Sequence, residues 1–385
     1  MKKWVHLLIC AIALLVITGC GKENKTEKST ETAYEIETYA SSEEDLRPFK
    51  VQRLDEQTLL IYGSNDTYEE ALFKVDLKNK KTTLVMELKD NQEIYFTEKG
   101  CLWIEAKGLW EVRDKFFAQT EENEEQFDAL QEAYYQEREA LDRQLMYLDY
   151  GQTKPEQLIA STENIKIQNF TIISSDELQI DFQDKKENNY FKMSFDIETK
   201  KSTEIKEKDV FSLVKLAHSD DFLTVNYETE TLMIKAAKDH QQKKLKMPYP
   251  KESYYDYVSY LDNDLLFLEL SFSDKDDAVK RTLQRYDVKK KKAENIEFEN
   301  VDLQKVIKMD ALENYVIVSY ESEDEEAKSS LQVFENDEFK QVQVDELEKG
   351  KYQFVSNDNG DEWILYDHEN LDKQWMMINV KGAKE

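Results

Sequence analysis

The sequence predicts an all-β fold made of one repeated unit. A short pattern, in which an aromatic or aliphatic residue precedes Asp and lysines follow, recurs around Asp76, Asp149, Asp196, Asp239 and Asp287, with weaker copies at Glu335 and Asn379. Successive copies lie 73, 47, 43, 48, 48 and 44 residues apart. A period in this range is typical of a repeat architecture with one supersecondary unit per repeat.

The clearest copy, residues 281–298, predicts the outer hairpin of each unit. Side chains of opposite character alternate along 283–288, which is the pattern of a half-buried strand. The lysine run Lys289–Lys292 is expected to form a solvated turn, and a second strand is expected to end at Phe298.

An inner hairpin is expected before each outer one, because a turn rich in Asp, Asn, Ser and Gly precedes an apolar strand in every unit. The turns lie near Asp55, Gly100, Asp176, Asp220, Asn263, Asn314 and Asn359. The strands begin near Leu59, Cys101, Leu178, Phe222, Leu265, Tyr315 and Glu362. Seven units of four local strands, without crossover helices, exclude a parallel α/β sheet.

Residues 33–385 resemble a seven-bladed β-propeller, whose blades are four-stranded repeats of this length. The chain ends soon after the third strand of the seventh unit, WMMINV from Trp375. Residues 33–39, AYEIETY, are expected to supply the fourth strand and so to close the ring. The Gly-His and Trp-Asp dipeptides of WD40 repeats are absent, as are the tryptophan-docking motifs of quinoprotein dehydrogenases. The alternatives are a pair of β-sandwich domains and an eight-bladed ring.

One insertion, at about residues 113–144 of the second unit, interrupts the period. Thr120 is a plausible N-cap, and Phe127, Leu130, Tyr134, Leu141 and Leu145 recur at intervals typical of an amphipathic helix. We expect one helix of roughly 20 to 24 residues. Its apolar stripe packs either on its own propeller, as a lid, or on a protein partner, for which Phe127, Leu130, Tyr134 and Leu141 are the candidate contacts. The resemblance implies that the insertion lies on the propeller face where ligands usually bind.

The first residues predict an export signal. Lys2 and Lys3 precede the apolar run from Leu7 to Ile17, which is short for a membrane-spanning helix. Residues 16–20, VITGC, resemble a bacterial lipobox, in which Cys20 is diacylated after cleavage behind Gly19. The resemblance implies a signal peptide at 1–19 and a lipidated cysteine with a flexible linker at 20–32. The alternative is an ordinary signal or an uncleaved anchor.

The charge balance limits the possible partners. The chain has 81 acidic and 52 basic residues, a net charge of −29, which argues against binding to nucleic acid or to anionic lipid. The lipid on Cys20 is therefore expected to hold the protein on the extracytoplasmic face of the cell membrane. Abundant Lys, Glu and Asn favour a Gram-positive cell surface. Cys101 is expected to be a small buried hydrophobic residue.

Residues that could perform chemistry are sparse. His218, His240 and His368 are expected in turns or loops, with no metal-ligand spacing between them. Asp358 and Asp361, within the 357–362 loop, are a weak calcium candidate, but a hairpin turn is expected at that position. No catalytic residue and no cofactor is predicted.

Two function classes remain. The first is a non-enzymatic lipoprotein whose propeller is a docking or scaffold surface for an envelope protein. The second is a propeller that binds or hydrolyses a sugar or peptide in its central channel, which should bring carboxylates or histidines together at the inner strands. The sequence leaves enzymatic activity undecided and favours the first class.

Overall fold

The computed structural model describes most of the chain beyond residue 33. The described residues are 34–39, 46–88, 90–122, 124–205, 214–219, 221–226, 231–236, 241–248, 253–272, 279–322, 326–345, 347, 351–357, 362–367 and 375–380. Residues 1–34 and 35–385 form two separate units, and the second contains the sheets described below. The predicted signal peptide and linker lie outside the described residues.

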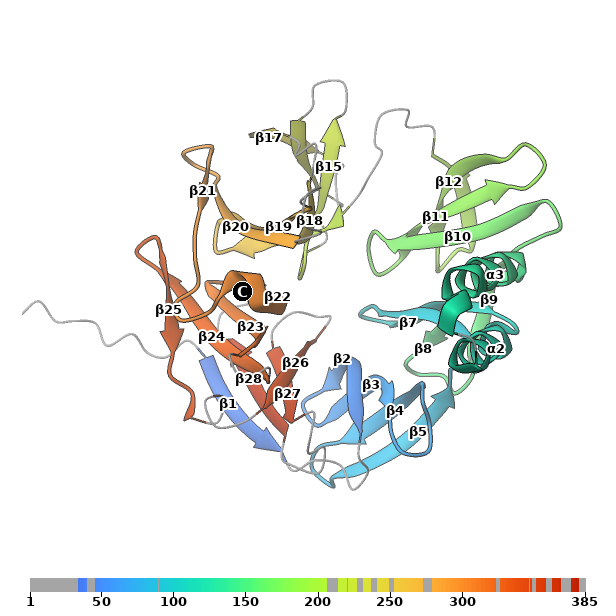
Figure 1. Cartoon of the computed structure of the whole chain (residues 1–385), viewed down its shortest axis with the longest axis horizontal. Helices are drawn as coiled ribbons and strands as arrows, with labels where there is room; N and C mark the ends of the chain where they lie inside the picture. Colours follow the sequence, from blue (N-terminus) through green and yellow to red (C-terminus); the bar gives the residue numbers. More distant parts are fainter. Residues whose placement is uncertain are drawn as a thin grey trace, which may run out of the picture. The chain divides into compact units, whose positions relative to one another are not determined.

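Within the described chain, seven four-stranded antiparallel sheets form a ring, which makes the fold a seven-bladed β-propeller (Figure 1). Blades one to three comprise β2 (Arg47–Asp55), β3 (Thr58–Ser64), β4 (Ala71–Asp76), β5 (Lys81–Glu87); β6 (Asn91–Phe96), β7 (Gly100–Ala106), β8 (Arg143–Asp149), β9 (Glu156–Ala160); and β10 (Ile165–Ile172), β11 (Glu177–Asp184), β12 (Asn189–Asp196), β13 (Lys201–Glu204). Blades four to six comprise β14 (Val214–Lys215), β15 (Phe222–Asn226), β16 (Thr231–Lys235), β17 (Gln242–Pro248); β18 (Ser253–Leu261), β19 (Asp264–Phe272), β20 (Val279–Asp287), β21 (Lys292–Asn295); and β22 (Val306–Leu312), β23 (Tyr315–Glu321), β24 (Ala327–Glu335), β25 (Glu338–Val342). A short 3₁₀ helix, η2 (Leu303–Lys305), precedes β22.

The seventh blade confirms the predicted closure. Its strand order is β1-β28-β27-β26, from β1 (Tyr34–Tyr39), β26 (Tyr352–Ser356), β27 (Glu362–Asp367) and β28 (Trp375–Val380). The amino-terminal strand therefore covers the edge that β28 would otherwise expose. The two-sandwich and eight-bladed alternatives are wrong.

The seam between the seventh and first blades is also held by charge. Arg53 of β2 donates from Nε and Nη2 to the Glu362 carboxylate of β27, at 2.7 and 2.6 Å. Glu362 is 1% exposed, so this pair is desolvated and bidentate, which is a strong geometry for a hydrogen-bonded ion pair. Val51 of β2 also forms a parallel bridge with Asn357, just after β26.

The recurring aspartate of the repeat has a local structural reason. The carboxylates of Asp76, Asp196 and Asp287 accept a hydrogen bond from the backbone N–H three residues later, at 2.6 to 2.9 Å. One residue further on, a lysine has a positive φ of 55° or 56°, as at Lys80, Lys200 and Lys291. Asp holds a turn by bonding to its own backbone, and the left-handed residue then returns the chain into the outer strand.

The hydrophobic core lies between neighbouring blades. One buried cluster joins Ile61 and Phe73 of blade one to Ile364 and Met377 of blade seven, and another joins Leu268 of blade five to blade six. The apolar strands after the inner turns are buried on both faces for this reason. Cys101 is 0% exposed within this packing, and burial raises the pKa of its thiol to about 12, which confirms the predicted hydrophobic role.

The insertion lies between β7 and β8, as expected, but the prediction of a single helix is wrong. Two helices, α2 (Leu109–Glu122) and α3 (Phe127–Ala140), are separated by the 3₁₀ turn η1 (Glu124–Gln126). Thr120 is not an N-cap: it lies inside α2, and its hydroxyl donates to the Phe116 and Phe117 carbonyls. The first helix was missed because Leu109–Phe117 follows directly on an apolar strand.

The predicted end of the insertion also needs correction. Leu141 has extended backbone after α3, at φ −66° and ψ 140°. Leu145 belongs to β8, where it is 0% exposed. Leu145 is a buried residue of strand β8 that happens to lie four residues after Leu141. Its spacing therefore continues the helical period by chance, although the helix has already ended.

Candidate functional site

A cavity of about 780 Å³ lies along the inner strands of the propeller. Among the described residues, all blades except the fifth contribute to its wall. One residue from each, in the order of blades one, two, three, four, six and seven, is Lys50, Tyr95, Asn169, Lys215, Asp310 and Ser356. Most of these residues lie in the C-terminal halves of the inner strands or in the turns that follow them, such as Thr97 and Ser174. The cavity is therefore closer to the end of the blades where the first strand turns into the second.

Asp310 of β22 is the centre of a buried polar network in this wall. Its Oδ2 accepts hydrogen bonds from Ser356 Oγ at 2.6 Å and from Trp363 Nε1 at 2.7 Å, and lies 2.7 Å from His218 Nε2. Its Oδ1 accepts a hydrogen bond from Tyr257 OH at 2.9 Å, and Tyr257 OH accepts one from the Ala311 N–H. The network thus joins blades four, five, six and seven around one carboxylate.

The electrostatics of Asp310 follow from this geometry. Burial alone would raise its pKa, but the charge of His218 and the hydrogen bonds from His218, Ser356 and Trp363 outweigh it, so the pKa lies below its ordinary value. Burial, with the charge of Asp310, holds the pKa of Tyr257 well above its ordinary value. Asp310 is an ionised acceptor with its lone pairs engaged, which suits a role in holding blades together.

Sequence reasoning missed this pairing. His218 was assigned to a turn, and it does lie in the turn after β14 with φ 56°, but it is also half-buried against a carboxylate 92 residues away. The one local signal was Asp310 itself, since a charged residue in an apolar inner strand requires a partner when buried.

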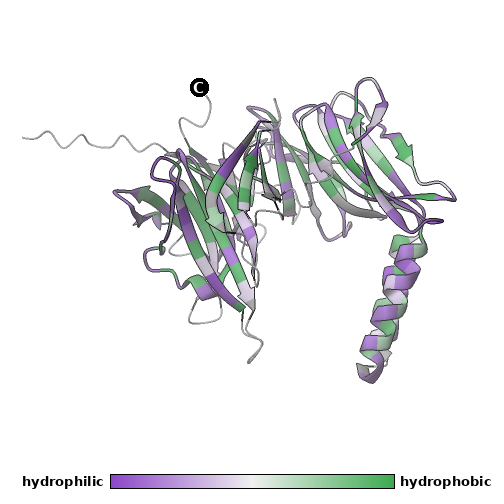
Figure 2. Cartoon of the chain, turned by 90° about the horizontal axis from the view of Figure 1, so that it is seen from above, coloured by the Kyte–Doolittle hydropathy of each residue, from purple (hydrophilic) through white to green (hydrophobic). Residues whose placement is uncertain are grey.

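The helical hairpin α2–α3 displays an aromatic cluster, defined here as Phe116, Phe117, Phe127, Tyr134 and Tyr135. The ring centroids of Phe116 lie 4.9 Å from Tyr134, 6.0 Å from Phe127 and 5.6 Å from Phe117. Three members remain exposed: Phe117 by 54%, Phe127 by 46% and Tyr135 by 47%. Figure 1 shows α2 and α3 next to each other, and Figure 2 shows the helical insertion extending away from the strands.

The predicted contact residues occupy different places on this hairpin. Tyr134 and Phe127 face Phe116 of α2, so part of the stripe packs on the second helix of the insertion. Leu130 and Leu141 are half-buried, and none of the described α3 side chains is fully buried. A contact of the stripe with a sister helix was not among the predicted alternatives.

The hairpin and the cavity lie at opposite ends of blade two. Phe96 pairs with Cys101 near the cavity, whereas Asn91 pairs with Glu105 next to the end of β7, where the hairpin begins. The hairpin therefore leaves from the N-terminal end of the inner strand, and the cavity residues Thr97 and Glu98 follow its C-terminal end.

The remaining predicted site residues are not placed. Cys20, Asp358 and Asp361 lie outside the described residues, as do His240 and His368. Among the residues that the structure describes, no group of three or more His, Cys, Asp or Glu side chains could hold a metal ion. In the same part of the chain, no helix is both long and apolar enough to cross a membrane.

Comparison with known proteins identifies the fold. No family model matches the chain, and no curated protein matches it. Among solved structures, the chain is similar to an oligogalacturonate lyase from Vibrio parahaemolyticus, with a TM-score of 0.51, 10% identity and coverage of 91% of this chain and 98% of the other. It is also similar to an oligogalacturonate lyase in complex with manganese, with a TM-score of 0.52, 9% identity and coverage of 91% and 97%.

A third similar structure is the β-propeller domain of the trilobed protease from Pyrococcus furiosus, with a TM-score of 0.47, 14% identity and coverage of 88% of this chain and 93% of the other. At these identities the likeness concerns the backbone architecture alone. The seven four-stranded sheets of the described chain place this protein among the β-propellers.

Proposed function

We propose that the protein is a lipid-anchored, extracytoplasmic propeller that serves as a non-enzymatic docking surface for a basic protein of the cell envelope. The α2–α3 hairpin is the contact surface. The observation that carries this proposal is the aromatic cluster, because three large rings are half-exposed on one projecting element. Exposed apolar patches rimmed by charge are typical of interaction sites.

Charge favours a basic partner. Residues 109–140 contain ten acidic and three basic residues. A second copy of this hairpin would bring like charges together, whereas a basic face would be attracted and oriented by them. Aromatic residues are also enriched at the energetic centres of protein interfaces.

The membrane anchor rests on the lipobox pattern that ends in Cys20. Under this proposal, residues 1–19 are removed, 20–32 form the lipidated linker and 33–385 form the propeller domain. The partner then lies within reach of the membrane through the lipid on Cys20. Two acyl chains are sufficient for stable anchoring, where one is marginal.

Replacement of Cys20 tests the anchor separately. Cys20→Ala should leave the signal uncut or release the protein into the medium, and Cys101→Ala should keep it in the membrane fraction. The measurement is fractionation with mass spectrometry of the amino terminus. Membrane retention of Cys20→Ala with a cleaved, unlipidated amino terminus would contradict the anchor.

The docking surface is tested by the double change Phe117→Ser and Phe127→Ser, with Tyr190→Ser as the control. Tyr190 is 65% exposed on β12, outside the hairpin. A partner should be captured from native membranes by the wild type and the control, released by rising salt, and lost with the double variant. Equal capture by all three proteins, or capture that ignores salt, would overturn the proposal.

A second candidate function is binding of a sugar or peptide in the central channel. The cavity of about 780 Å³ favours it, because its wall combines aromatic Tyr95 and Phe170 with polar side chains. Asp310 and His218 do come together there, but the carboxylate already has four partners. We therefore rank ligand binding in the channel second, and hydrolysis behind simple binding.

A further inference from the structure

A second cavity, of about 380 Å³, lies at the base of α3 between blades two and three. Its wall includes Arg138 and Glu139 from the end of α3, Arg143 at the start of β8, and Gln168 of β10. Tyr95, Asn169 and Phe170 line both this cavity and the central one. The two cavities therefore share a wall.

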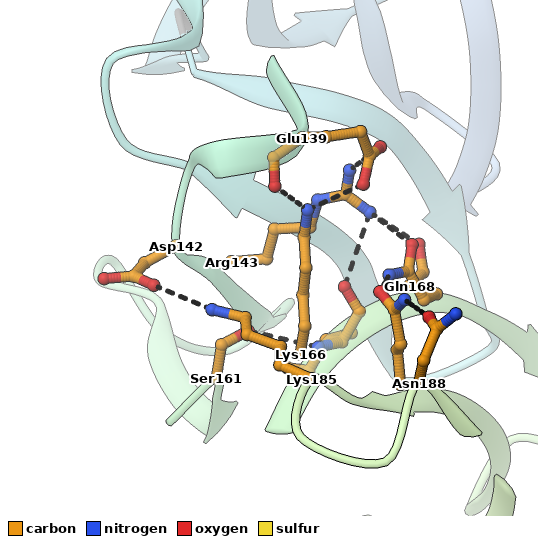
Figure 3. Close-up of polar contacts among 10 residues, drawn as sticks. Glu139, Asp142, Arg143, Ser161, Lys166, Gln168, Lys185 and Asn188 are labelled. Carbon is orange, nitrogen blue, oxygen red and sulfur yellow. Dashed lines mark hydrogen bonds and ion pairs between the residues drawn. The ribbon is translucent and has the colours of Figure 1, made fainter. Parts of the chain in front are cut away.

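Two buried cationic side chains lie in or next to the wall of this cavity. Arg143 is 4% exposed and Lys166, directly behind the wall, is 2% exposed. Both contact one carboxylate, Glu139, which lies 2.7 Å from Arg143 Nη2 and 2.7 Å from Lys166 Nζ (Figure 3). Lys166 also donates to the Glu139 carbonyl, and so ties the last turn of α3 to blade three.

The charges do not balance. Arg138, Arg143, Lys166 and Lys185 gather here, against Glu139 and the largely exposed Asp142. This excess of positive charge stands out in a chain with 81 acidic and 52 basic residues. Burial, with the nearby charges of Arg143 and Lys185, outweighs Glu139 and lowers the pKa of Lys166. A buried cation without a counter-charge is costly, since desolvation is not repaid.

Two donor atoms next to the cavity also have no acceptor in the described part of the protein. The Nε atoms of Arg138 and Arg143 are buried and have no hydrogen-bond partner among the described residues. Arg143 uses its Nη1 on the Gln168 carbonyl and side-chain oxygen, at 3.1 and 3.2 Å. A buried donor left without an acceptor costs about 1 to 3 kcal/mol. Arg138, whose side chain is partly exposed, also lacks an ion-pair partner in the described part of the chain.

We propose that this cavity binds a small anion through a phosphate or carboxylate group, with Arg138 and Arg143 as its ligands and Lys166 as the charge behind them. Guanidinium groups bind both kinds of oxyanion through paired N–H donors. The volume admits an anion of the size of phosphate or citrate, and the polar wall offers Gln168 and Asn169 to its remaining oxygens. The anion would supply the missing counter-charge.

The test is calorimetric titration of the full chain in detergent with inorganic phosphate and, separately, with citrate at constant ionic strength. The variant is Arg138→Gln, because Arg138 is half-exposed and makes no ion pair that the fold needs. The matched control is Arg113→Gln, which removes the same charge from α2, where Arg113 pairs with Glu70 at 2.9 Å outside this cavity.

The wild type and Arg113→Gln should bind at least one of the two anions saturably, with one anion per chain. Arg138→Gln should weaken that binding about tenfold or more, since a charged hydrogen bond is lost. Arg143→Gln should abolish it while the thermal transition of the propeller reports whether the variant is folded. The anion that binds separates phosphate from carboxylate chemistry.

Two results would overturn the proposal: no saturable binding of either anion up to tens of millimolar, or equal affinity in the wild type and Arg138→Gln. Both results are independent of the docking proposal, because partner capture depends on Phe117 and Phe127, at the opposite end of the hairpin helices from Arg138.

Discussion

The channel wall around Asp310 and the α2–α3 hairpin both depart from the usual distribution of side chains, in opposite senses. The wall buries a carboxylate that is 4% exposed, and the hairpin exposes the rings of Phe117 and Phe127 by about half. Buried polar groups and exposed large apolar groups are the informative exceptions in a folded protein. The buried carboxylate finds its partners inside the fold, whereas the exposed rings do not.

The buried exception is explained inside the molecule. Each Asp310 oxygen has at least one hydrogen-bonding partner, and the partners come from three other blades. The exposed exception is only partly explained, since Tyr134 and Phe116 pack against each other while Phe117, Phe127 and Tyr135 stay in contact with solvent. The network therefore stabilises the ring, whereas the hairpin offers a surface. The predictions below separate these roles.

The largest effect is expected from deletion of residues 33–40, which removes β1. The deletion would expose the edge of β28 and leave the ring held at this seam by the Arg53–Glu362 pair and its neighbours. We expect a lower melting temperature than in any point variant below, with aggregation on heating. Calorimetry and light scattering measure both, and an unchanged melting temperature would contradict closure by β1.

Asp310→Ala should have the next largest effect. It leaves Tyr257, Ser356 and Trp363 as buried donors without their acceptor, and it leaves His218 without its carboxylate. Breaking a buried, hydrogen-bonded ion pair typically costs about 3 to 5 kcal/mol. Urea unfolding measures the loss, and Asp66→Ala, at an exposed turn, should stay within about 0.5 kcal/mol of the wild type. Equal stability of the two variants would show that the network holds nothing together.

Acid should remove the contribution of Asp310 with a defined sign. Its pKa is lowered in the folded state, so the unfolded chain binds the proton more tightly and stability falls as pH falls. The contribution is complete above about pH 4, the ordinary pKa of Asp, and is lost as pH falls through the folded pKa, at about 1.4 kcal/mol per unit of lowering. Unfolding free energies of the wild type and Asp310→Asn should therefore converge between pH 5 and strong acid. If the difference in unfolding free energy between the wild type and Asp310→Asn does not change with pH, Asp310 is not the group whose pKa is lowered by folding.

The smallest effect on the propeller is expected from the double change Leu130→Ser and Tyr134→Ser. Tyr134 packs on Phe116 of α2 and Leu130 is half-buried one helical turn before it. The hairpin should therefore lose helix, seen by far-UV circular dichroism, while the main calorimetric transition stays in place. Ala129→Ser and Ala133→Ser, at exposed α3 positions, are the matched control. A main transition lowered by about 2 to 4 kcal/mol would instead indicate a lid packed on the propeller.

The sequence predicted the strands and turns of the propeller more accurately than it predicted the helical insertion. Turn chemistry and alternation are local, so strand β23 and the outer turn at Asp287 lie where the sequence placed them, and the incomplete last unit correctly predicted closure by β1. The insertion was found from the broken period, but α2 was missed because its apolar start continues an apolar strand. Leu145 shows the reverse error, since a strand residue can continue a helical spacing by coincidence.

The sequence by itself determined the repeat and the site of the insertion, because each depends on residues close together in the chain. Closure by the first strand was inferred from the incomplete last unit, and the structure decided between seven and eight blades. Only the tertiary structure brought His218 to Asp310 across 92 residues, packed Tyr134 of α3 against Phe116 of α2, and brought Lys166 of blade three to the Glu139 carboxylate of α3. These contacts join different blades or different helices. Their geometry is set by how sheets pack around the ring, which no local pattern of residues encodes.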